Sequence, residues 1–173
     1  LLGITSLWFC YDHQSKFFTK LSPIPITNVL TTKKTGNTPC VVSATVDDIR
    51  DMIERVRPTI AFGLELSIPK DYIHQRASGI NHIICELAQK NNVRIGFSSS
   101  LIIKNTGMKQ AQILGRMSQN IELYRKYHVD TVIASFADHP YDMRSPADLK
   151  SLFITLGMHP SDAAKSLMEI PTK

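Results

Sequence analysis

Side chains that could hold a phosphate gather in one short stretch of the chain, "HQRASGINH", at residues 74–82. His74 and Arg76 come first, and Ser78 and Asn81 stand where an apolar helical pattern begins. The N-terminus of a helix presents unpaired N–H groups and the positive end of the helix dipole. Ser78 and Asn81 could therefore either cap this helix or help its first turn to bind a phosphate or a carboxylate.

The same arrangement recurs later in the chain. Arg144 stands directly before Ser145, a predicted helix N-cap, and Pro146 occupies the first helical position. An arginine at such a place can bind two oxygens of an anion at once. The alternative is that both serines only cap their helices while the arginines pair with nearby acids.

Positive charge is concentrated in one part of the sequence. The chain of 173 residues has a formal net charge of +5, and residues 94–126 contain a single acid, Glu122. The basic residues of that segment are Arg94, Lys104, Lys109, Arg116, Arg125 and Lys126. Such clustering predicts a basic surface that attracts a polyanion.

A second set of polar side chains indicates a different chemistry. Two Asp-His pairs and a glutamate fall near predicted strand ends, where they could bind a divalent metal and activate water: Asp12, His13, Glu65, Asp138 and His139. No His-Glu-x-x-His, G-x-S-x-G or phosphate-binding glycine motif supports a metalloenzyme, a serine hydrolase or a nucleotide cofactor. A metal-dependent phosphoesterase is thus one alternative, and a scaffold whose basic face pairs with an acidic protein is another.

Apolar periodicity predicts the elements that position these residues. Strands are expected at about 3–11, 26–32, 39–43, 59–66, 93–98 and 130–136, and helices at about 46–56, 80–88, 108–127, 145–157 and 160–169. Alternating strands and helices predict parallel β-α units. The fold class is therefore α/β, and since a full eight-stranded barrel usually needs ~250 residues, a barrel would be compact or incomplete. A single domain over residues 1–173 is expected.

The longest predicted helix, 108–127, has two different faces. Its apolar side chains at helical spacing should face the core. Lys109, Gln112, Arg116 and Asn120 fall on the opposite face, which should be polar, cationic and exposed.

Composition limits the class of protein. No apolar run approaches the ~20 residues that span a bilayer, and the three cysteines form no C-x-x-C pair. Reduced thiols, a cytoplasmic location and no membrane partner are expected.

Three segments together resemble a known family: "HQRASGINHIICELAQKNNVRIGFS", "GMKQAQILGRMSQNIELYRKYHVDTVIAS" and "DMRSPADLKSLFITLGM". In this order they resemble the archaeal ribonuclease P protein component 3 family and its eukaryotic thirty-kilodalton relative, over residues 59–158. The positions that match are His74, Arg76, Asn81, His82, Ser98, Arg116, Ser135, Arg144, Ser145 and Asp148.

The resemblance implies a TIM-barrel-like fold and a non-catalytic role. In that family the RNA subunit of ribonuclease P removes the 5′ leader from precursor tRNA with Mg²⁺, and the proteins support it. A heterotetramer with protein component 2 is also implied, and no cofactor bound by this chain. The hypothesis from the sequence is that phosphates of the ribonuclease P RNA are bound by His74, Arg76, Arg94, Lys104, Lys109, Arg116 and Arg144, while an apolar loop surface contacts the protein partner.

Overall fold

A parallel sheet of four strands forms the centre of the computed structural model, which describes residues 7–11, 26–30 and 40–167. The strands are β3 (Val41–Ser43), β4 (Ile60–Phe62), β5 (Arg94–Ser98) and β6 (Thr131–Ala134), in the spatial order β3-β4-β5-β6. β1 (Leu7–Tyr11) and β2 (Ile26–Leu30) form a separate parallel pair. All six strands fall inside predicted strand regions, and every pairing is parallel, as expected.

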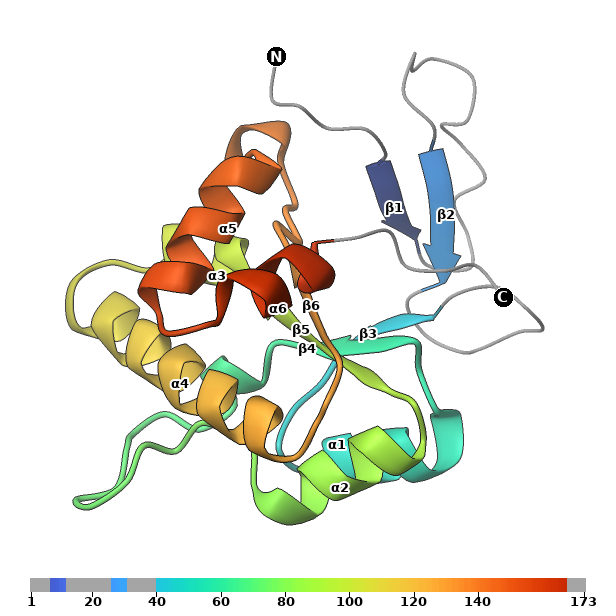
Figure 1. Ribbon diagram of the computed structural model, residues 1–173, viewed down its shortest axis with the longest axis vertical. Coiled ribbons are helices and arrows are strands. Elements are labelled where there is room, and N and C mark those ends of the chain that lie inside the picture. The colour runs from blue at the N-terminus through green and yellow to red at the C-terminus, as the bar shows by residue number, and fades with distance from the viewer. Residues whose placement is uncertain (1–6, 12–25, 31–39, 168–173) are drawn as a thin grey trace.

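Helices connect these strands and cover the sheet (Figure 1). Figure 1 shows α1 and α2 lying side by side, and α5 and α6 lying together elsewhere on the sheet, while α4 packs against both α2 and α3. The helical elements are α1 (Ile49–Asp51), a π-helical turn (Met52–Val56), a 3₁₀ turn (Leu64–Leu66), α2 (His82–Lys90), α3 (Ser99–Ile103), α4 (Gly107–Lys126), a 3₁₀ turn (Pro140–Asp142), α5 (Pro146–Thr155) and α6 (Pro160–Ser166).

The core is centred on β5. Residues 95–98 of this strand are all buried, which fits a parallel strand covered on both faces. The ring of Phe97 lies 5.5 Å from that of Tyr124 on α4 and 5.1 Å from that of Phe153 on α5, measured between centroids. Three elements far apart in the sequence therefore meet at one aromatic cluster.

The arrangement agrees with the predicted fold class. Four parallel strands with surrounding helices are consistent with an incomplete barrel. No helix of the described ranges is long and apolar enough to cross a membrane. The expectation of one domain over residues 1–173 extends beyond the described residues and stays a prediction.

Two predicted strands end early. The strand predicted for 59–66 ends at Phe62, because Gly63 adopts a φ of 92° and a 3₁₀ turn follows. The strand predicted for 130–136 ends at Ala134, and Phe136, with a φ of 44°, stacks its ring on Phe62 at 4.1 Å. Both strands end at the same edge of the sheet, where the loops with the candidate residues begin.

Candidate nucleic-acid interface

The carboxyl ends of β4, β5 and β6 share one edge of the sheet, because the three strands are parallel and adjacent. The serines at the ends of β5 and β6 connect the two strands there. The carbonyl oxygen of Ser135 accepts hydrogen bonds from Ser98 Oγ at 3.3 Å and from Ser100 N at 3.0 Å. In parallel α/β folds this edge is where binding sites are usually found, and here it is crossed by the loops that follow three strands.

The loop after β4 is hydrogen-bonded to α4 at several points. Residues 67–78, called the anchored loop below, extend away from the sheet as a long excursion beside α4 (Figure 1). The side chain of Arg116 on α4 enters the base of the loop. Its Nη1 donates to the carbonyl oxygens of Glu65 at 2.6 Å and Ile68 at 2.8 Å, and its Nε donates to Asp71 Oδ1 at 2.8 Å. Nη2 lies 2.8 Å from the same carboxylate oxygen.

This geometry corrects the expectation for α4. Arg116 and Asn120 do not lie on an exposed outer face: Arg116 is 1% exposed and Asn120 is fully buried. Asn120 Nδ2 donates to Glu65 Oε1 at 3.2 Å and to the carbonyl oxygen of Ser78 at 3.4 Å. The reason is that Asn120 lies within the core stripe of α4 at 100° per residue, and Arg116 lies at the border of that stripe, where the anchored loop covers it.

Arg76 lies on the outside of the same loop. Its Nη1 donates to the carbonyl oxygen of Gly115 at 2.9 Å, and its guanidinium packs on the backbone of that glycine, where an added Cβ would come within 2.6 Å of Arg76 Cζ. Gln119 Nε2 donates to the carbonyl oxygen of Arg76 at 3.4 Å. Arg76 is exposed nonetheless, so an anion can reach its remaining N–H groups.

The helix start next to the anchored loop differs from the expectation in one residue. Asn81 is the N-cap of α2, and its Oδ1 accepts from Ile84 N at 2.9 Å. Ser78 caps no helix: it is 2% exposed, and its Oγ accepts from Gln119 at 3.4 Å. Between them Gly79 has a φ of 81°, and an added Cβ would lie 2.7 Å from the carbonyl oxygen of Leu64, so the turn requires glycine.

The second predicted helix start is confirmed. Ser145 is the N-cap of α5, with its Oγ accepting from Asp148 N at 3.1 Å. Arg144 precedes it, and its Nη1 donates to the carbonyl oxygens of Tyr141 at 2.9 Å and Met143 at 2.8 Å. Arg144 therefore stiffens the loop after β6, and the residue is half-exposed.

The remaining predicted phosphate-binding residues divide between the two ends of the sheet. His74 is exposed in the loop that follows β4, and Lys104 and Lys109 are exposed at the end of α3 and in the first turn of α4, the two helices that follow β5. Lys104 forms an ion pair with Asp138. Arg94 begins β5 and thus lies at the opposite edge. The structure brings five of the seven basic residues to one edge, buries Arg116 and separates Arg94.

The residues of the phosphoesterase alternative do not assemble in the described part of the chain. Within that part, no group of three or more His, Cys, Asp or Glu side chains could hold a metal. Glu65 is buried against Asn120, and the Asp138 carboxylate is occupied by Lys104. Asp12 and His13 lie outside the described residues.

Two acids at the base of the anchored loop, Glu65 and Asp71, have shifted pKa values. Burial raises the pKa of Glu65 to about 7, even though its backbone, Asn120 and Arg116 favour the carboxylate. Partial burial also acts to raise the pKa of Asp71, but hydrogen bonds from Ala77 N–H and Arg116 outweigh it and leave that pKa below its ordinary value. Asp71 is therefore a carboxylate at neutral pH, paired inward with Arg116.

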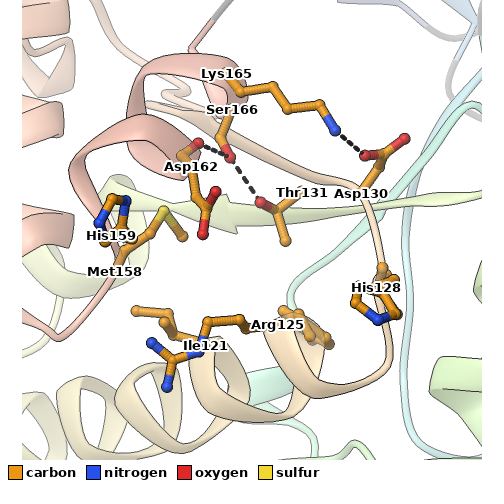
Figure 2. Close-up of a pocket in the computed structure, with 12 residues that line it drawn as sticks. Ile121, Arg125, His128, Asp130, Thr131, Met158, His159, Asp162, Lys165 and Ser166 are labelled. Carbon is orange, nitrogen blue, oxygen red and sulfur yellow. Dashed lines mark hydrogen bonds and ion pairs between the residues drawn. The ribbon is translucent and has the colours of Figure 1, made fainter.

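A pocket of about 290 Å³ lies away from this edge, between the end of α4, the start of β6 and α6 (Figure 2). Figure 2 shows Lys165 paired with Asp130 across one side of it. It is also lined by Arg125 and Asp162 and by two histidines, His128 and His159. Because its charges are of both signs, the pocket offers an anion less net attraction than the edge with the anchored loop.

Sequence reasoning missed the acids that organise this surface and the aromatic residue at its tip. The sequence pattern assigns Asp71 no role and indicates Glu65 only as a possible metal ligand. Tyr72, which is 62% exposed, belongs to none of the predicted sets. The available signal was a tyrosine within a polar, proline-containing loop.

Comparison with known proteins identifies the family. A family model described as RNase P subunit p30 matches residues 49–173. The chain belongs to this family. Among similar proteins is a Ribonuclease P protein component 3 from Methanosarcina acetivorans, 31% identical over 98 residues, which are 57% of this chain and 41% of that protein. Its counterpart from Thermococcus kodakarensis is 33% identical over 115 residues, 66% of this chain and 52% of that protein.

The fold of this p30-family chain also matches a solved structure. The match has a TM-score of 0.73 at 19% sequence identity and covers 92% of this chain and 77% of the other, which belongs to a cryo-EM structure of archaeal Ribonuclease P with mature tRNA. The matched segments span roughly half or less of the two relatives named above. The family match and the structural match therefore show the family and the fold of this chain.

Proposed function

We propose that this chain is a non-catalytic protein subunit of ribonuclease P, which supports a catalytic RNA in removing the 5′ leader from precursor tRNA. Membership of the p30 family supports this proposal, as does similarity to proteins named Ribonuclease P protein component 3. In this proposal the chain binds no cofactor, and Mg²⁺ serves the RNA. Protein component 2 is its partner, in a cytoplasmic heterotetramer.

The observation that carries the RNA-binding role is the gathering of cations at one edge of the sheet. His74, Arg76, Lys104, Lys109 and Arg144 reach this edge on three separate segments of the chain. Cations spread over one surface bind the phosphate backbone without reading bases, and release of counterions drives the association. Arg116 is left out of this set because its guanidinium is buried.

Reconstituted cleavage tests the function. The catalytic RNA and protein component 2 are incubated with precursor tRNA at limiting Mg²⁺, with and without this chain. We expect leader removal to require the chain. Cleavage by the chain alone, without the RNA, would refute the non-catalytic role.

The dependence of RNA affinity on salt tests the surface. If four phosphates are engaged, log affinity falls with log salt at a slope of about −3. Lys109→Ala should reduce the steepness by about 0.7 to 0.9. Lys90→Ala is the matched control, since Lys90 is exposed at the far end of α2, and should leave the slope unchanged. A slope near zero in the unmodified protein would contradict the proposed surface, and Arg94→Ala reports whether the opposite edge takes part.

A further inference from the structure

The tip of the anchored loop, residues 70–76, exposes an aromatic and an aliphatic side chain together. Tyr72 is 62% exposed and Ile73 is 94% exposed. Lys70, His74 and Arg76 on either side of them are also exposed. The acid of this segment, Asp71, is paired with Arg116 beneath the loop, so the charge that the tip presents to a partner is positive.

The tip is held in shape before any partner binds. Asp71 Oδ1 accepts from Ala77 N at 2.8 Å in addition to Arg116, which closes the base of the tip. Tyr72 N donates to the carbonyl oxygen of Gln75 at 3.0 Å, which closes the turn above it. A surface that is already ordered loses less conformational entropy on binding, so an exposed aromatic ring displayed in this way is suited to recognition.

We propose that Tyr72 stacks on an unpaired base of an RNA strand, while Lys70, His74 and Arg76 hold phosphates beside that base. This inference rests on the proposed RNA-binding function and names the form of RNA that the tip takes. Proteins that bind single strands combine cations along the backbone with aromatic rings on which bases stack. A paired base inside a duplex is already stacked and offers Tyr72 no free face.

Charge and size favour RNA over a protein at this position. The cations flanking Tyr72 match a phosphate backbone without further requirement, whereas a protein would need an apolar pocket with an acidic rim. A stable protein interface also involves about 20–30 residues on each side, many more than the seven of the tip. Arg76 belongs to the proposed phosphate-binding set already, so the tip continues that surface.

Equilibrium binding of the full chain to two RNAs of equal length, a single-stranded oligoadenylate and a perfect duplex, tests the inference. We expect Tyr72→Leu to weaken single-strand binding about 5- to 100-fold, and Tyr72→Phe to restore it, because phenylalanine keeps the ring. Neither change should alter the slope of log affinity against log salt. Arg76→Ala should instead reduce that slope by about 0.7 per phosphate lost.

Tyr141→Leu is the matched control. Tyr141 is 92% exposed at the same edge, but Asp142 follows it directly in the chain, and among the described residues no ion pair engages that carboxylate as Arg116 engages Asp71 beside Tyr72. We expect this variant to bind the single strand as the unmodified chain does. An equal loss in Tyr141→Leu, or an equal loss on the duplex in Tyr72→Leu, would overturn the assignment.

The outcomes separate this inference from the proposed function. A steep salt slope with no effect of Tyr72→Leu would overturn stacking and leave the RNA-binding surface intact. A salt-independent affinity would overturn the surface itself. If Tyr72→Leu and Ile73→Ala spare RNA binding and abolish assembly with protein component 2, the tip is a protein contact and the inference is wrong.

Discussion

Replacing Arg116 with methionine separates two roles for this residue, a phosphate contact and a support for the anchored loop. The structure favours support, because the guanidinium is buried and donates to two carbonyls and to Asp71. Methionine fills a similar length without any donor. We therefore expect Arg116→Met to destabilise the protein and loosen the loop.

The expected loss of unfolding free energy depends on the partners that Arg116→Met leaves without a donor, which are Asp71 and two backbone carbonyls. Removing one partner of a buried ion pair typically costs about 3–5 kcal/mol, mostly because the other charge stays buried. Asp71 keeps 27% of its side-chain surface exposed, so water can partly replace Arg116 there. The carbonyls of Glu65 and Ile68 can reach water only if the loop moves outward. A loss of about 3 kcal/mol, at the lower end of that range, is the expected result.

Urea unfolding and hydrogen exchange measure this loss. The free energy of unfolding should fall by about 3 kcal/mol, and the amide of Ala77, which donates to Asp71 at 2.8 Å, should exchange faster. Arg125→Met, on the exposed side of the same helix, should change stability by no more than about 0.5 kcal/mol. Arg116→Lys keeps the charge but lacks the planar fork, so it should restore only part of the stability.

One combination of results would refute this reasoning. If Arg116→Met costs less than about 1 kcal/mol, leaves Ala77 exchange unchanged and reduces the salt slope of RNA binding by about 0.7, Arg116 binds phosphate directly. The sequence-based hypothesis would then be right and the buried geometry would not describe the functional state.

Three further changes test other parts of this region. Glu65 has a pKa of about 7 in the folded protein and 4.5 in the unfolded chain, so between these pH values the folded state binds more protons. The free energy of unfolding therefore falls as the pH rises from 4.5 to 7. In urea unfolding, Glu65→Gln should remove this dependence and raise the free energy of unfolding by up to about 3 kcal/mol at pH 8. Gly79→Ala should cost at least ~2 kcal/mol of unfolding free energy, because strain and the Leu64 carbonyl both oppose a Cβ, whereas Gly157→Ala, with open space around it, should cost only about 1 kcal/mol. Ser145→Ala should lower the thermal midpoint by an amount equivalent to about 1 kcal/mol, and Ser145→Thr should recover most of it; an unchanged midpoint would contradict the cap.

The positions of the strands could be predicted because each is a short apolar run between polar segments. The faces of α4 could be predicted only in part. Ile113, Met117 and Tyr124 mark the core side by their period, and the same period places Asn120 within that stripe and Arg116 at its border. Nothing in the periodicity indicates that a non-periodic loop covers a second side of the helix. An arginine at the border of an apolar stripe has the same sequence signature whether a loop covers it or water does.

The choice of helix cap was ambiguous for a related reason. Ser78 and Asn81 are both good N-cap residues, and each precedes the apolar stripe of α2. The positive φ of Gly79 decides between them, because it turns the chain so that Ser78 is buried and Asn81 faces the N–H of Ile84. The sequence contained the glycine, but only the packing of the turn on Leu64 shows what it does.

The burial of Arg116 explains how a loop with little apolar content can hold a fixed shape beside a helix. Between residues 70 and 76 the large apolar side chains Tyr72 and Ile73 are exposed, so hydrophobic burial cannot order this part of the loop. Hydrogen bonds with α4 do so instead. Arg116 and Asn120 donate to backbone carbonyls at the base of the loop. The Arg76 side chain donates to the carbonyl oxygen of Gly115, and the Gln119 side chain donates to the carbonyl oxygen of Arg76. The basic residues that sequence reasoning grouped as one surface therefore divide by role, with Arg116 holding the loop and Arg76 left accessible on its outer side. A loop ordered from below can keep its own apolar and cationic side chains free for a partner, which is the property that an RNA-binding edge requires.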